Sequence, residues 1–268
     1  MRTHRLLPLS AALLALIGAC STVAETGRHR IAWFPDSYMS EMGASAYDAE
    51  TTAKYPLITT GKDYEMVKRI GERIAAASGR NYQWEFRLLN APDVVNAFCL
   101  PGGKVAVYSG LLKVTQNEDA LACVIGHEVA HATSGHGNER MTQGMIAQGV
   151  MSAADLALQS WSKMSDTARA STMQALGVGA QLGAILPFSR THESEADEIG
   201  LRFMVRAGYD PNEAPKLWAR MAAASKDRPP EFFSTHPDPD NRAKRLAELI
   251  PKIVAEERGK KVQTPARR

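Results

Sequence analysis

The 268-residue chain has almost no excess of charge of either sign. Lysine and arginine number 32 against 29 aspartates and glutamates, which gives a formal net charge of +3. Arg2 and Arg5 lie within the first nineteen residues, which contain no acid, so the rest is closer still to neutral. This near-equality of positive and negative charge gives no indication of nucleic-acid binding, and we expect no nucleic acid as a partner. An apolar content of 44% over this length predicts one sizeable core and argues against disorder.

Long apolar runs are also scarce, and neither of the two candidates predicts a spanning helix. Residues 170–189 carry no charge and are nominally long enough to cross a bilayer, but glutamine, glycine and serine make them only mildly apolar. We therefore expect a helix packed inside the protein there. The other run, Leu6 to Ile17, follows a basic start and precedes Gly18, Ala19 and Cys20, as in an export signal.

A signal that ends directly at a cysteine resembles the lipobox of bacterial lipoproteins. The resemblance implies that Cys20 becomes lipidated and starts the mature chain, and Ser21 after it implies sorting to the outer membrane from the periplasm. The protein is then expected on the periplasmic face of that membrane, held by a lipid anchor and not embedded. Cleavage at an ordinary signal-peptidase site is the alternative.

Cysteines are few, and only Cys99 and Cys123 remain after Cys20. An oxidising compartment permits a disulfide between them, but both lie among apolar neighbours, so two buried thiols are an equal expectation. The chain as a whole divides into a signal peptide (1–19), an aperiodic tether (20–46), a globular domain (47–258) and a basic flexible tail (259–268).

Periodicity predicts a mainly α, α+β fold. Trp84, Phe86 and Leu88 alternate with polar residues as in a half-buried strand, and the Pro-Gly-Gly at 101–103 predicts a hairpin or bent strand. Helices are expected from about 64 to 78, from Thr115 to about 134, through 138–162, from 191 to 207, and near the C-terminus. A small sheet therefore precedes the helix from Thr115, for which Thr115 and Glu118 suggest a capping box.

That helix carries the sequence HEVAH at 127–131. Residues four apart lie about 40° from each other around a helix, so His127 and His131 can hold one metal ion, and Glu128 can reach a water on it. Two neutral imidazoles with an open position suit zinc, and the carboxylate suits a general base. Two surface histidines beside a salt-bridged glutamate are the alternative explanation.

The third ligand has three candidates. His136 is one residue short of the metzincin position, where Gly137 stands, and a one-residue shift rotates a helical side chain by about 100°. Cys99 would make a His₂Cys site as in deformylases, which does not suit an exported protein. Glu193 and Asp197 lie one turn apart beside Ala196 and Gly200, so one can bind the metal while the other holds a ligand histidine from behind.

Glu195 and Glu198, on the other faces of the same helix, are expected to be surface charges.

Four ordered segments resemble the gluzincin peptidases that include bacterial HtpX and the CaaX prenyl proteases, and above all the periplasmic lipoprotein and Oma-type branches of that family. The segments lie at 96–112, 126–141, 189–201 and 234–242, within a resemblance that covers 47–250. The resemblance implies a zincin-like fold and one zinc ion, with Glu193 as the third ligand and Asp197 as its support. His136 occurs in the family pattern without being a ligand.

The same resemblance implies two further features. His236 would lie at the active site, where it can steady the oxyanion or block the metal, and Arg242 is expected to tie its loop down. The segment Gly102, Gly103, Lys104 and Val105 would offer a strand edge on which an extended substrate pairs. This branch lacks obvious spanning helices, which argues against a substrate inside the membrane.

The predicted function is hydrolysis of peptide bonds in unfolded or misassembled cell-envelope proteins, by zinc-activated water and the base Glu128. A zinc-retaining chaperone without catalysis is one alternative, although it predicts loss of Glu128, which is present. A hydrolase of another envelope amide bond, such as one in peptidoglycan, is the other, because the motif does not distinguish amide substrates.

Overall fold

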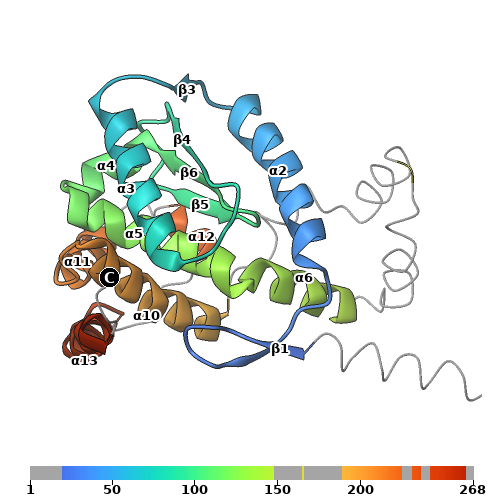
Figure 1. Cartoon of the computed structure of the whole chain (residues 1–268). Helices are drawn as coiled ribbons and strands as arrows, with labels where there is room; N and C mark the ends of the chain where they lie inside the picture. Colours follow the sequence, from blue (N-terminus) through green and yellow to red (C-terminus); the bar gives the residue numbers. More distant parts are fainter. Residues whose placement is uncertain (1–19, 148–164, 166–188, 225–230, 237–241, 264–268) are drawn as a thin grey trace, which may run out of the picture.

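The computed structural model describes residues 20–147, 165, 189–224, 231–236 and 242–263 (Figure 1). The predicted signal peptide, nearly all of the charge-free stretch, and the predicted helix beyond Ala147 lie outside these residues. The N-terminal half contains β1 (Cys20–Thr22), β2 (His29–Ile31), α2 (Asp36–Ala53), β3 (Leu57–Ile58), α3 (Lys62–Ser78), β4 (Glu85–Leu89), β5 (Ala97–Leu100), β6 (Lys104–Tyr108) and α4 (Ser109–Thr115). The remainder contains α5 (Glu118–Ser134), α6 (His136–Ala147), α10 (Arg190–Ala207), α11 (Glu213–Ala224), α12 (Phe232–Thr235) and α13 (Arg242–Gln263).

The main sheet has four strands in the order β3-β4-β6-β5. β4 and β6 are parallel, while β3 and β5 pair antiparallel with their neighbours. β5 and β6 form the predicted hairpin around Gly102 and Gly103, both of which have positive φ angles that favour glycine. The prediction of a mainly α, α+β fold with a small sheet beside the motif helix is confirmed.

The sheet separates two groups of helices, because successive side chains of a strand face opposite sides. Val105 and Val107 of β6 belong to the core shared with α3 and α5. Ala106 and Tyr108 face a second core, into which α2 inserts Tyr38 and Met42 among other side chains. In Figure 1, α2 accordingly lies apart from α3 and α5.

Helix α5 is the buried centre of the fold, in contact with α3, α10, α11 and β5. It ends at Gly135, as predicted, but it begins after Asn117, whose side chain accepts a hydrogen bond from the Ala120 N–H. The predicted capping box at Thr115 is therefore wrong. Thr115 instead ends the short helix α4, and Gln116 adopts a left-handed conformation between the two helices.

Helices α5 and α10 pack with their backbones in near contact. A Cβ on Gly126 would lie 3.1 Å from the Gly200 carbonyl oxygen, and one on Gly200 would lie 3.0 Å from the His127 nitrogen. Only glycine at both positions permits this distance without a shift of backbone. The close approach predicted from Ala196 and Gly200 is present, and it brings Glu193 near α5.

Residues 20–46 do not form an aperiodic tether. β1 pairs with β2, and α2 begins at Asp36 and buries Tyr38, Met39, Met42 and Ala46. The buried positions of α2 recur at helical spacing, but they include Gly43, Ala46 and Thr51, so the apolar pattern of the segment is weak in the sequence.

The C-terminal boundary also shifts, since α13 runs to Gln263 and includes the first residues of the predicted tail. No helix in the described part of the chain combines the length and apolarity that a membrane span requires.

Candidate metal centre

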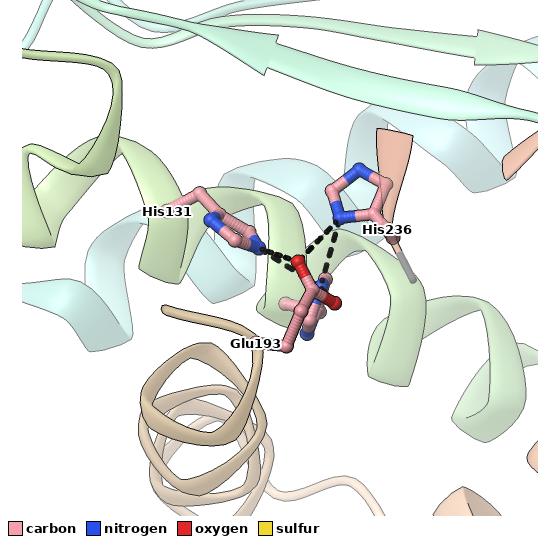
Figure 2. A group of neighbouring side chains, drawn as sticks. His131, Glu193 and His236 are labelled. Atoms are coloured by element: carbon pink, nitrogen blue, oxygen red, sulfur yellow. Dashed lines mark hydrogen bonds and ion pairs between the residues drawn. The ribbon is translucent and has the colours of Figure 1, made fainter. Parts of the chain in front are cut away.

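Four buried side chains from three parts of the chain meet at one point. His127 and His131 come from α5, Glu193 from the first turn of α10, and His236 directly follows α12. Figure 2 shows His131, Glu193 and His236 converging, with the Glu193 carboxylate between the two rings. One potential ligand atom from each of the four residues lies within 4.8 Å of all the others, and every one of these residues is buried.

The spacing of these atoms fits a zinc ion. Nε2 of His127 is 3.0 Å from Nε2 of His131 and 3.4 Å from Oε2 of Glu193, and Nε2 of His131 is 3.3 Å from Oε1 of Glu193. Tetrahedral zinc with bonds of about 2.0–2.2 Å places its ligand atoms roughly 3.3–3.6 Å apart. Two imidazoles and one carboxylate are also the donor set of a catalytic zinc site.

Asp197 lies behind His127, as predicted. Its Oδ1 is 3.1 Å from Nδ1 of His127, on the side of the ring away from the cluster. Burial raises the pKa of Asp197, but Arg242 and His127 outweigh that effect and hold it below its ordinary value.

Arg242 is buried beside the metal cluster. It is 2% exposed, and it donates from Nη2 to Asp197 at 2.5 Å and from Nη1 to Glu193 at 3.2 Å, with its guanidinium over the Trp218 ring. It therefore contacts two carboxylates of the site, whereas the loop that it was expected to tie down, residues 237–241, lies outside the described residues. In the sequence, the only indication that Arg242 belongs to the site was its place at the end of the segment 234–242, the fourth of the segments that resemble the peptidase family.

The protonation of the cluster reflects these charges. Burial and Arg242 lower the pKa of His127, but Glu193 and Asp197 outweigh them and raise it to about 9. Burial alone would raise the pKa of Glu193, yet His236 and His127 hold it far below its usual range. An ionised Glu193 is the state that a divalent cation requires, and a cation bound to His127 would displace the proton that the raised pKa keeps on this ring.

Glu128 is 1% exposed, and its Oε1 has no hydrogen-bond partner among the described residues. Burial raises the pKa of this carboxyl group above its ordinary value, against the lowering effect of His236 and His127. Nε2 of His236 lies 3.4 Å from Oε1. A desolvated carboxylate with an unsatisfied oxygen beside a metal site is well suited to accept a proton.

His136 and Glu195 lie on the other side of His131. Nδ1 of His136 is 2.9 Å from Nδ1 of His131, and Nε2 of His136 is 2.8 Å from Oε2 of Glu195. His136 is thus beside the cluster but not in it. The prediction that Glu195 is a surface charge is wrong, because its side chain is 5% exposed and is also bound by Arg28. Glu198 is half-buried and pairs with Arg202.

Comparison with known proteins assigns this arrangement to a family. The model of peptidase family M48 matches residues 62–250, which include all four members of the cluster.

The chain belongs to peptidase family M48. It is 38% identical over 190 residues to the mitochondrial metalloendopeptidase OMA1 of Schizosaccharomyces pombe, an alignment that covers 69% of this chain and 52% of the relative. It is 33% identical over 222 residues to the beta-barrel assembly-enhancing protease of Yersinia pestis, with 77% of this chain and 41% of the relative covered. The protein of the same name from Escherichia coli is 29% identical over 226 residues, with 82% and 44% covered.

The chain therefore spans about half of the length of these relatives, or less. The predicted family is confirmed, and the names of the relatives support the predicted class of enzyme, a metalloendopeptidase. The predicted cofactor, one zinc ion, fits both the family and the donor set described above.

A cleft of about 250 Å³ opens beside the cluster of His127, His131, Glu193 and His236. It is lined by Glu128, His131 and His236, by residues of β5, and by residues of α2 that include Met39 and Ser40. Cys99, the alternative ligand, borders this cleft but is not in the metal cluster, and burial raises its pKa well above the ordinary value. Cys99 and Cys123 are both unbridged.

The predicted substrate edge needs correction. Lys104 and Val105 belong to β6, which is paired with β4 on one side and β5 on the other, so their backbone groups are used within the sheet. The described sheet has β3 and β5 as its edge strands, and of these β5 borders the cleft, which Phe98, Cys99 and Leu100 line. Gly102 also lines it, while Gly103 packs against Trp84.

Proposed function

We propose that the chain is a zinc-dependent endopeptidase that cleaves unfolded or misassembled proteins of the cell envelope. His127, His131 and Glu193 would hold the metal, Asp197 would support His127, and Glu128 would be the general base. The observation that carries this proposal is the buried meeting of the two α5 imidazoles with the α10 carboxylate at ligand spacing. Bound zinc supplies Lewis acidity and lowers the pKa of a coordinated water to about 7.

Glu128 would move the proton in this reaction. It accepts a proton from the attacking water and then delivers it to the nitrogen of the leaving amine, so the carboxylate is regenerated in each turnover. Its Oε1, which has no hydrogen-bond partner among the described residues, and its place in the lining of the cleft support this role. Burial, which raises its pKa, brings its basicity closer to what proton transfer at neutral pH requires.

His236 would meet the charge that develops on the substrate carbonyl oxygen. Its ring lies between Glu193, 3.1 Å from Nδ1, and Glu128, 3.4 Å from Nε2. A single preorganised donor to such an oxygen is worth about 3 kcal/mol of barrier. The same position allows Nδ1 to act as a fourth ligand, which would have to leave before substrate enters.

The substrate would be an extended segment that adds a strand to β5. An edge strand offers unpaired backbone groups, and the edge strand β5 lines the same cleft as Glu128. Only unfolded chains or loops can pair in this way, which favours damaged or misassembled proteins as substrates. The two bacterial relatives are named for assembly of β-barrels, which supports an envelope setting.

The proposed location is the periplasmic face of the outer membrane, with Cys20 as the lipidated residue. Cys20 is exposed at the start of β1, so a lipid there could enter a membrane without unfolding the domain. Mass spectrometry of the mature N-terminus tests this point. A diacylglyceryl cysteine is expected, and an unmodified N-terminus at any other residue would contradict it.

Zinc content and proteolysis of paired α10 variants test the function. Protein that starts at Ser21 should bind one zinc and degrade unfolded casein. Glu193→Ala should lose both properties, whereas Glu198→Ala, on the same helix but paired with Arg202, should keep both. Zinc retained by Glu193→Ala would refute the ligand assignment. Zinc binding by the unmodified chain without cleavage of any unfolded protein would favour a chaperone or a hydrolase of another amide bond.

A further inference from the structure

His131 presents its two ring nitrogens to different surroundings. Nε2 faces the metal cluster, 3.0 Å from Nε2 of His127 and 3.3 Å from Glu193. Nδ1 faces away from the cluster, towards Nδ1 of His136 at 2.9 Å. Zinc binding through Nε2 requires a lone pair on that atom, so the proton of a neutral His131 must be on Nδ1.

This proton determines the state of the neighbouring ring. A hydrogen bond between two imidazole nitrogens needs one N–H and one lone pair, so Nδ1 of His136 must accept. The proton of His136 is then on Nε2, where Glu195 Oε2 accepts it at 2.8 Å. In this line of hydrogen bonds from His131 through His136 to Glu195, every donor has an acceptor, and all three side chains are buried.

Arg28 fixes the far end of the line. Its Nε donates to Glu195 at 2.7 Å, and its Nη1 and Nη2 donate to Glu139 at 2.8 and 2.6 Å. Thr26 also donates to Glu195. These residues connect β1 and β2, so the segment that follows Cys20 holds together α6 and α10, the helices that carry Glu139 and Glu195.

We infer that His136 is a positioning residue of the metal site, which accepts the Nδ1 proton of His131 and is itself oriented by Glu195 and Arg28. The inference rests on the proposed ligand role of His131. Its function is to fix the ring orientation and tautomer of His131, so that the Nε2 lone pair is already directed at the zinc position. Outer partners of this kind are worth about 10- to 100-fold in metal affinity.

Glu195 and Glu139 form a matched pair for the test. Both side chains are 5% exposed, both are bound by Arg28, and both have a pKa lowered to about 2, because partners that include Arg28 outweigh the effect of burial. Only Glu195 accepts from His136, while Glu139 is near His192 instead. A purely structural role predicts similar effects of both truncations, and the positioning role predicts different ones.

Zinc dissociation constants of Glu195→Ala and Glu139→Ala should be measured by competition with a chromophoric chelator, with melting of the metal-free proteins as the folding control. Glu195→Ala should weaken zinc binding about 10- to 100-fold. Glu139→Ala should stay close to the unmodified protein. Equal effects of the two truncations, or none, would overturn the inference.

Two amide substitutions of His136 test the inference without any change at Glu195. Asparagine places its side-chain oxygen near the former Nδ1 and can still accept from His131, whereas glutamine reaches towards Glu195 and cannot. His136→Asn should therefore bind zinc more tightly than His136→Gln, and the reverse order or equal affinities would contradict the inference.

His131→Ala separates this inference from the proposed function. If it leaves zinc affinity unchanged, the ligand set is wrong and the inference falls with it. If it abolishes binding while both matched pairs show no difference, only the inference is wrong.

Discussion

At the scale of single residues, the site depends on carboxylates whose surroundings differ. Glu193 is ionised among imidazoles, Asp197 is held by Arg242, and Glu128 has an oxygen without a hydrogen-bond partner among the described residues. Carboxylates can therefore take the three proposed roles of ligand, support and base, because burial and neighbouring charges set the pKa of each group separately.

Glu128→Gln separates catalysis from metal binding. The amide has the same shape but cannot accept the proton, so kcat/KM on unfolded casein should fall by about 10²- to 10⁴-fold while zinc content stays the same. Glu118→Gln, at the exposed start of the same helix, is the control and should keep full activity. Residual cleavage at more than a tenth of the unmodified rate would rule out Glu128 as the base.

The residues of the candidate metal cluster could be predicted from the sequence, but the places of Glu195 and Arg242 could not. The spacing of His127 and His131 fixes their common face, and the resemblance adds Glu193. Glu195 is about 200° from Glu193 around α10, so a helix with one buried face would expose it. α10 is covered on that side as well, by Arg28 and Thr26 from the N-terminal segment, and no local pattern predicts such a distant contact.

At the scale of elements, the candidate site exists because α5 and α10 approach each other closely enough for their side chains to reach one metal position. Gly126 and Gly200 make this approach possible. The small residues of the α10 segment predicted this close approach. The start of α5 was predicted wrongly, at Thr115 instead of after Asn117. A single capping pattern cannot show that two helices follow each other, and Asn117 is as good a cap as Thr115 or better.

Gly200→Ala should therefore damage both stability and the metal site. The added Cβ would lie 3.0 Å from a backbone nitrogen of His127, and a shift of α10 to relieve this contact would move Glu193 away from the two imidazoles. We expect a loss of about 1–3 kcal/mol in the free energy of unfolding and weaker zinc binding. Chemical denaturation and zinc competition measure the two effects.

Gly259→Ala, in α13 with no atom near the added Cβ, is the control. It should be neutral or slightly stabilising, since alanine favours a helix over glycine. If Gly200→Ala behaved in the same way, the close approach of α5 and α10 would not be needed.

At the scale of the whole molecule, ion pairs connect segments far apart in the chain. Arg206 of α10 bonds Glu25 near the N-terminus and Glu257 of α13, and Arg202 adds a second contact to Glu257. The sequence could not predict these contacts, because they join residues more than fifty positions apart with no shared pattern. They attach the expected tether to the folded domain through Glu25 and hold α13 against α10 through Glu257.

These contacts predict how stability depends on pH. Arg206 chiefly lowers the pKa of Glu257 from 4.5 to about 2, so folding favours the ionised carboxylate. This stabilisation is complete above pH 4.5 and is lost as the pH falls through 4.5 towards 2. Glu257→Gln should therefore lower stability at pH 7 and flatten its dependence across that window, as measured by urea denaturation at a series of pH values.

Glu256→Gln is the comparison, because its side chain is 38% exposed against 3% for Glu257 and solvent screens its pairing with Arg202. Its effect should be clearly smaller. Equal effects at the two positions would show that the buried ion pairs do not stabilise the domain.

The position of a zinc ion tests the account most directly. Crystals of the zinc-loaded protein, measured on both sides of the zinc absorption edge, locate the metal independently of the model of the chain. We predict one peak about 2.0–2.2 Å from Nε2 of His127, Nε2 of His131 and a carboxylate oxygen of Glu193. A peak bound by Cys99 or His136, with the Glu193 oxygens outside bonding distance, would contradict the account.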